Sequence, residues 1–221
     1  HLRRYRMQSK VILSATALLL TIPAFLFYLT DFADLPVGER ALASLFQAVT
    51  PRTAGYNTVD LTKMSDTSQA VTILLMLTGG APGSTAGGMK VTTLAVLIAN
   101  AAAVFHRRED SRLFDRRLDY SAIRNAAAIL LLYLSLTFVG AAVISEVEGL
   151  PLGACLYETA SAAGTVGLTL GLTPQLGTLS QSILILLMFF GRVGGLTLIY
   201  AAFSGHDLTY ARYPKEMITV G

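Results

Sequence analysis

The sequence predicts an all-α integral membrane protein that contains two copies of a helix–pore-loop–helix unit. Three observations predict this fold class: long apolar stretches, an internal repeat, and short helices that are followed by loops rich in Gly and Thr. Of the 221 residues, 53% are hydrophobic and 14% are charged, whereas about 25% of residues are charged in soluble domains. This composition favours a chain that lies in a lipid bilayer.

Four apolar stretches are long enough to account for membrane spans. Three of them, at 11–29, 126–144 and 183–203, are close to the ~20 residues that cross a bilayer. The fourth, 71–104, is too long for one simple span and contains GGAPGSTAGGMK at 79–90. Inside a helix, Gly costs about 1 kcal/mol against Ala and Pro costs about 3 kcal/mol. We therefore expect this helix to break at the glycine-rich segment.

The glycine-rich segment also resembles a phosphate-binding loop at first sight. Gly83 and Gly88 have the spacing of the two glycines in G-x-x-x-x-G-K-[ST]. However, Met89 occupies the position of the lysine, and Lys90 is followed by Val91 instead of Ser or Thr. Nucleotide binding at this loop, in a membrane enzyme or a nucleotide-coupled carrier, is thus a less favoured alternative.

Charged residues predict the orientation of the chain. Basic residues lie before the first span, between the second and third spans and after the last: Arg3, Arg4, Arg6, Lys10, Arg107, Arg108, Arg112, Arg116, Arg117, Arg124, Arg212 and Lys215. By the positive-inside rule, the N-terminus, the connection at 106–124 and the C-terminus are cytoplasmic. The opposite segments are acidic on balance: Asp31, Asp34, Glu39, Asp60, Asp66, Glu146, Glu148 and Glu158 outweigh Arg40, Arg52 and Lys63. We expect this outer face to attract cations.

The chain contains an internal repeat. SQAVTILLMLTGG at 68–80 matches SQSILILLMFFGR at 180–192 at a constant offset, and the same offset aligns TAGYNT from Thr53 with TVGLTL from Thr165. Upstream, LFQAVT and LYETAS align after a slip of one residue. The ordered matches include Gly, Ser, Gln and Thr, which apolar helices do not share by chance. They indicate a duplicated unit.

Each unit contains a short helix, at about 39–49 and 152–163, that cannot cross a bilayer. Each short helix starts on the outer side and must return there, which makes it re-entrant. Non-helical backbone at membrane depth is tolerated only where it is buried or lines a watery cavity. We interpret the following loops as pore lining, in which Gly55 and Gly167 permit unusual backbone angles. The alternative is a pair of surface turns beside amphipathic helices.

At these residues the sequence resembles the Trk/Ktr/HKT superfamily of potassium transporters, and most closely its Ktr-type membrane subunits. Members carry four such units in one chain, and TPRTAGYNTVD and TVGLTLGLTP are similar to their third and fourth filters. The resemblance implies that potassium binds the backbone carbonyls of Thr53, Ala54, Gly55, Thr165, Val166 and Gly167. It also implies pore units at 1–105 and 125–205, a cytoplasmic basic linker at 106–124 and a cytoplasmic tail at 206–221.

The glycine-rich segment is similar to the intramembrane gate of that superfamily. The implied gate residues are Gly79, Gly80, Gly83, Gly87, Gly88 and Arg192. Arg192 also stands out without the family, because an arginine near the centre of a span costs at least about 2.5 kcal/mol and should face a cavity or a partner. Lys90 and Asn57 are further candidates for the ion path, although Lys90 could equally cap a loop carbonyl.

The predicted function is uptake of potassium, or another monovalent cation such as Na⁺, across the cell membrane. The chain begins with His1 and supplies two filter segments, so we expect the C-terminal half of a four-unit transporter; a homodimeric two-unit channel is the alternative. Implied partners are a second copy of the full-length protein and a cytosolic nucleotide-binding regulatory subunit, with anionic lipid as an alternative contact for the linker. We expect no cofactor, no enzymatic activity and no nucleic-acid partner.

Overall fold

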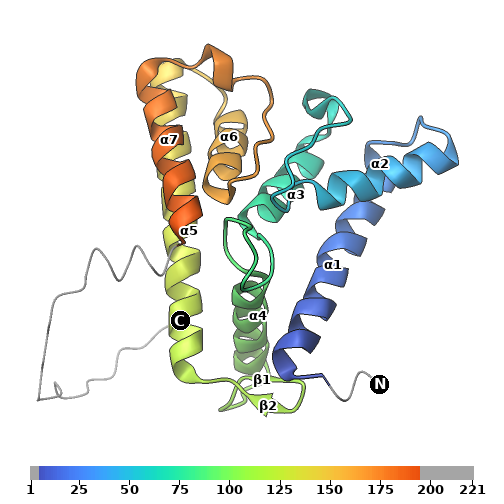
Figure 1. The fold of residues 1–221 in the computed structure, drawn as a ribbon, viewed down its shortest axis with the longest axis vertical. Helices are drawn as coiled ribbons and strands as arrows, with labels where there is room; N and C mark the ends of the chain where they lie inside the picture. Colours follow the sequence, from blue (N-terminus) through green and yellow to red (C-terminus); the bar gives the residue numbers. More distant parts are fainter. Residues whose placement is uncertain (1–4, 195–221) are drawn as a thin grey trace, which may run out of the picture.

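The computed structural model describes residues 5–194. Figure 1 shows long helices that run side by side along the long axis, with two short helices near one end and a small hairpin at the other. Predictions that concern the first four residues, the end of the last span and the tail at 206–221 lie outside the described residues.

Two described helices are long and apolar enough to cross a membrane: α1 (Met7–Thr30) and α5 (Tyr120–Glu148). They contain the predicted spans at 11–29 and 126–144. Because α5 begins at Tyr120, the last residues of the predicted linker are already helical. The last span is described as α7 (Thr178–Val193).

The predicted break in the long apolar stretch is confirmed. Two shorter helices, α3 (Asp66–Leu77) and α4 (Val91–Phe105), are separated by an irregular segment at 78–90. This segment contains Pro82 and all five glycines of the predicted gate. We call residues 78–90 the glycine loop.

The two short helices are α2 (Val37–Val49) and α6 (Leu152–Gly164). Each starts directly after a proline, Pro36 or Pro151, which is compatible with a helix start because its missing N–H is not needed there. In Figure 1, the segment that follows each helix runs back towards the end of the molecule where the helix began. Their course is re-entrant, as the sequence predicted. Both following segments contain a 3-10 turn, η2 (Leu61–Lys63) and η3 (Thr173–Gln175).

A small hairpin is the exception to the all-helical prediction. It consists of β1 (Arg112–Leu113) and β2 (Arg116–Arg117), which pair antiparallel within the basic linker. The two residues between the strands have φ of 47° and 60°, and a two-residue hairpin loop commonly needs such positive values at both positions. The hairpin folds the linker back against the helix ends.

The two units pack against each other through α3 on α6 and α4 on α5. At the first contact, a Cβ on Gly164 would lie 2.3 Å from the carbonyl oxygen of Met76, so only glycine permits this approach. Among residues 5–194, the buried apolar side chains form one cluster that runs from α1 to α7. Its most buried large side chains are Phe27, Met76, Ile144 and Tyr157.

A carboxylate at the end of the first helix of each unit makes the same pair of hydrogen bonds, to a backbone N–H and to a serine hydroxyl. Asp31, directly after α1, accepts hydrogen bonds from Ser65 N at 2.7 Å and from Ser68 Oγ. Glu148, the last residue of α5, accepts from Gly177 N at 2.9 Å and Ser180 Oγ at 2.6 Å. A carboxylate is favourable at a helix N-terminus, where the dipole is positive. These two acids, which the sequence suggested were part of a cation-attracting face, thus tie the first span of each unit to the start of the helix that follows its predicted filter loop, α3 or α7.

We predict that Asp31→Asn lowers the unfolding free energy of the full-length protein by about 1–2 kcal/mol, because charge-assisted hydrogen bonds are lost. Partial burial acts to raise the pKa of Asp31, but hydrogen bonds from Ser68, Thr30 and Ser65 outweigh it, so the pKa lies below its ordinary value of 3.8. The contribution is therefore present at neutral pH and is lost as the pH falls through the folded-state pKa.

Thermal unfolding in detergent, followed from pH 7 downwards, measures this difference. The exposed Asp34→Asn is the matched control and should unfold like the unmodified protein. Equal midpoints for the Asp31 and Asp34 variants at pH 7 would contradict the assignment.

Candidate ion pathway

The two predicted filter loops follow the same backbone course. Thr53 and Thr165 have φ of 68° and 54°, and Gly55 and Gly167 have φ of 76° and 94°. The residue between them, Ala54 or Val166, keeps a negative φ. The left-handed region is unfavourable for a residue with a Cβ such as Thr, and it persists only where the surroundings hold it. Both loops are thus held in one unusual conformation.

A hydroxyl side chain at the C-terminal end of each short helix holds the loop in this conformation by a hydrogen bond to its backbone. In the first unit, Thr50 Oγ1 donates to Tyr56 O at 2.5 Å. In the second, Ser161 Oγ accepts from Gly167 N at 3.2 Å. Thr50 and Ser161 are aligned in the repeat. A hydroxyl at this position therefore holds the backbone around the filter glycine in both units.

The two filter loops are in direct contact. A Cβ on Gly55 would lie 2.1 Å from the carbonyl oxygen of Val166, whereas nothing lies within 4 Å of the corresponding point on Gly167. Thr165, Val166 and Gly167 line a cavity of about 570 Å³, and Arg192 lines it as well. The structure thus brings the two predicted filter loops into contact and places Arg192 on the same cavity as the second loop.

The base of the glycine loop is closed by backbone hydrogen bonds. Gly79 N donates to Met89 O at 2.8 Å and Met89 N donates to Leu77 O at 2.9 Å. A Cβ on Gly79 would lie 2.0 Å from Gly87 O. Gly83 and Gly88 have φ of 85° and 67°, which glycine adopts without a steric penalty.

The rest of the loop lies directly against the second filter. A Cβ on Gly87 would lie 2.1 Å from Thr165 Oγ1 and 2.7 Å from Gly164 O. On Gly80, it would lie 2.7 Å from Ser84 Oγ, within the loop itself. The loop occupies the side of the filter that faces α4 and the hairpin (Figure 1).

Two cationic side chains hold the tip of the glycine loop. Arg192 Nη1 donates to Thr85 O, and Lys90 Nζ donates to Ala86 O at 2.5 Å. The expectation that Arg192 faces a partner is met by this contact across the two units. Lys90 caps a loop carbonyl, which was one of the two roles left open for it. Asn57 is exposed, and its side chain accepts from Val59 N at 3.2 Å in a local turn.

Arg52 is a site residue that the sequence counted only as an outer charge. Its Nη2 donates to Gly79 O at 3.1 Å, while its Nε is buried without a partner among the described residues. Arg52 precedes Thr53 directly, so it links the first filter loop to the base of the glycine loop. Its place next to a filter residue, in a segment at membrane depth, was the signal that could have marked it.

Glu158 is the second residue whose role the sequence missed. It is only 4% exposed and accepts from Thr169 Oγ1 at 2.7 Å, Leu170 N at 2.8 Å and Thr173 Oγ1 at 2.6 Å. Its carboxylate thereby holds the segment that leaves the second filter. The aligned residue in the first unit, Gln47, is also buried, but its side chain has no hydrogen-bond partner among the described residues.

This arrangement is that of a membrane protein of the pore-loop class, in which paired re-entrant loops meet beside a broken helix. The chain belongs to the TrkH family of cation transport proteins, whose family model matches residues 7–207. Its fold is similar to that of the potassium transporter TrkH from Vibrio parahaemolyticus, with a TM-score of 0.71 and 21% identity over 88% of this chain and 43% of that chain.

Two bacterial relatives match almost the whole chain. It is 34% identical to the Ktr system potassium uptake protein B of Bacillus subtilis, over 99% of this chain and 50% of the relative. It is 37% identical to the potassium/sodium uptake protein NtpJ of Enterococcus hirae, over 99% of this chain and 51% of the relative. The chain spans about half the length of these relatives.

We predict that Glu158→Ala destabilises the second predicted filter loop, because it leaves the partly buried Leu170 N–H without its acceptor. Hydrogen bonds to charged groups contribute about 1.5–3 kcal/mol each, so a loss of about 3 kcal/mol is expected. Glu158→Gln gives this position the residue type of Gln47 in the first unit. Its free energy of unfolding should lie between those of Glu158→Ala and the unmodified protein. Hydrogen exchange at the Leu170 amide and thermal unfolding of the full-length protein measure both effects.

The exposed Glu146→Ala is the control with the same change of charge on the neighbouring helix. If all three variants exchange the Leu170 amide at the rate of the unmodified protein, Glu158 does not hold this loop.

Proposed function

We propose that this chain forms part of a pathway for potassium uptake across the cell membrane. The observation that carries the proposal is the direct contact of two filter loops with one another and with the glycine loop, at Gly55, Val166 and Gly87. Backbone carbonyls can replace the hydration shell of a cation in such a filter. Two relatives named as uptake proteins for potassium, or for potassium and sodium, support the ion.

Two more filter segments are needed to surround an ion. The outer face of α2 is apolar and open in the described structure, with Val37 72% and Leu42 70% exposed, which supports further protein packing there. We assign the missing segments to a longer protein with four units, since the relatives are about twice this length. A homodimer of the two-unit chain is the competing arrangement.

The glycine loop is the proposed gate. It lies against Thr165 and is held by Arg192, so it obstructs the path next to the filter. The guanidinium also opposes a potassium ion by charge repulsion, which is strong in a medium of low dielectric constant. Opening then requires the loop to leave Thr165 and Arg192.

The further assignments follow from this function. The filter carbonyls carry K⁺, or Na⁺ in its place, without a cofactor and without covalent chemistry. The hairpin and both termini face the cytoplasm, where the hairpin meets a nucleotide-binding regulatory subunit, and the full-length protein pairs with a second copy. The family membership and the named relatives favour this function over nucleotide binding at the glycine loop.

We predict that Gly55→Ser in the full-length protein lowers potassium-over-sodium selectivity by about tenfold. A side chain at φ of 76° costs roughly 1–2 kcal/mol, and its Cβ would also collide with Val166 O. Gly167→Ser should lower the selectivity less, because a side chain there is strained by the positive φ angle but does not collide with a neighbouring atom. Isotope uptake into cells that lack other potassium uptake measures both variants.

Gly153→Ser is the control, since Gly153 lies in α6 with nothing within 4 Å of its Cβ position. Unchanged rate and selectivity in both filter variants would refute the assignment of these loops as the filter.

We predict that deletion of residues 83–86 raises the potassium flux, because it removes the carbonyls that Arg192 and Lys90 hold. Arg192→Gln should raise the flux by about tenfold, which corresponds to the loss of one charge-assisted hydrogen bond. Thr85→Ala is the matched control, because Arg192 binds the main-chain oxygen of Thr85 and not its hydroxyl. Flux into proteoliposomes is the measurement, and equal flux in all variants would exclude a gating role.

A further inference from the structure

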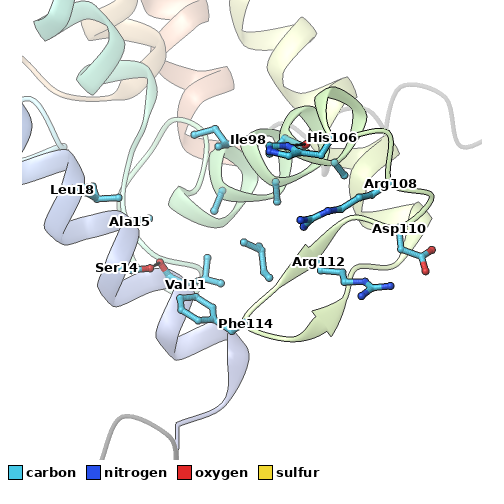
Figure 2. A pocket seen from close by; sticks show the side chains of 15 residues that line it. Val11, Ser14, Ala15, Leu18, Ile98, His106, Arg108, Asp110, Arg112 and Phe114 are labelled. Atoms are coloured by element: carbon cyan, nitrogen blue, oxygen red, sulfur yellow. Dashed lines mark hydrogen bonds between the residues drawn. The ribbon is translucent and has the colours of Figure 1, made fainter.

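A cavity of about 380 Å³ lies at the hairpin end of the molecule, away from the filter loops. Figure 2 shows it between α1, the end of α4 and the hairpin. Its wall is apolar, with Val11 and Leu18 from α1 and Ile98 from α4. Four alanines of α4 also line it, Ala95, Ala99, Ala102 and Ala103. These small side chains leave room between the two helices for a narrow apolar ligand.

The mouth of this cavity is positively charged. Arg108 and Arg112 line it, and Figure 2 shows the Arg108 side chain reaching across it. The acid in the lining, Asp110, is paired with Arg117 at 2.8 Å. Within residues 5–194, Arg108 and Arg112 have no ion-pair partner. Lys10 on α1 adds a further cation next to the cavity, 6.0 Å from the centre of the Phe114 ring.

The cavity also opens sideways, towards the surface that a bilayer would cover. Leu18 and Ile98, at its apolar end, are 57% and 60% exposed. Their helices are α1, which is long and apolar enough to cross a membrane, and α4, which belongs to the predicted apolar stretch at 71–104. The charged mouth lies on the side that the basic residues predict to be cytoplasmic. A ligand that fits both parts must therefore have an apolar chain in the membrane and an anionic group at its surface. Basic pockets between membrane helices on this side commonly bind acidic lipid head groups.

We propose that this cavity binds an anionic phospholipid, with one acyl chain between α1 and α4 and the phosphate against Arg108 and Arg112. The proposal does not depend on the ion pathway, because none of these residues lies in the filter or the glycine loop. It does give the bound lipid a position beside α4, the helix that continues directly from Lys90 of the glycine loop.

The test uses the full-length protein, stripped of lipid in detergent, with phosphatidylglycerol and phosphatidylcholine of identical acyl chains. Native mass spectrometry measures the retained lipid. We expect a preference for phosphatidylglycerol that the double variant Arg108→Gln, Arg112→Gln weakens about thirtyfold, the equivalent of about 1 kcal/mol for each basic residue. The control is Arg116→Gln on the facing strand, outside this cavity, which should keep the preference.

A second variant tests the apolar part without changing the charge. Ala99→Leu should fill the groove and lower the retention of phosphatidylglycerol, while the thermal unfolding midpoint of the lipid-free protein stays unchanged. The proposal is overturned if both lipids bind equally, if the double variant keeps its affinity, or if Arg116→Gln loses lipid equally. It is also overturned if inorganic phosphate displaces the lipid, which would indicate a site for a free anion.

Discussion

Close contact between backbones, without room for a side chain, is the constraint on which the rest of this structure depends. A Cβ at Gly87, Gly164 or Gly191 would lie between 2.0 and 2.3 Å from an atom of a neighbouring segment. These contacts join the glycine loop to the second filter, α6 to α3, and α7 to the end of α6. The loops meet because the helices can approach this closely, and the helices approach because the contact positions carry no side chain.

The duplicated units share their frame and differ at the glycine loop and Arg192, where we propose that the pathway is gated. Both units use a carboxylate to tie the first span to the helix after the predicted filter loop, and both use a hydroxyl to hold the backbone of that loop. They differ below the filter, where the first unit has the glycine loop and the second has Arg192. The hydrogen bond from Arg192 to Thr85 O joins these two divergent elements. After the duplication, the two units thus diverged so that one carries the donor of this hydrogen bond and the other carries its acceptor.

The sequence was sufficient for the spans at 11–29 and 126–144, the broken helix and the re-entrant course of the two short helices with their loops, because these depend on local apolar length, glycine content and the repeat. It was insufficient for Arg52 and Glu158. Their roles depend on which carbonyl or amide lies nearby in the folded protein, and charge alone assigned both to the outer face. The hairpin was missed because its four strand residues sit in a short, charged segment without an apolar pattern.

The interruption between α3 and α4 has a mechanical consequence. In a continuous helix, hydrogen bonds between successive turns keep all of the turns on one axis. Here α3 ends at Leu77 and α4 begins at Val91, so this continuity is interrupted. The chain between them is the glycine loop, whose base is closed by a few backbone hydrogen bonds. α3 is anchored against α6, whereas α4 packs on α1 and α5. α3 and α4 are therefore two separately packed helices and not one continuous rod, so the direction of α4 is set by α1 and α5 and does not have to follow the axis of α3.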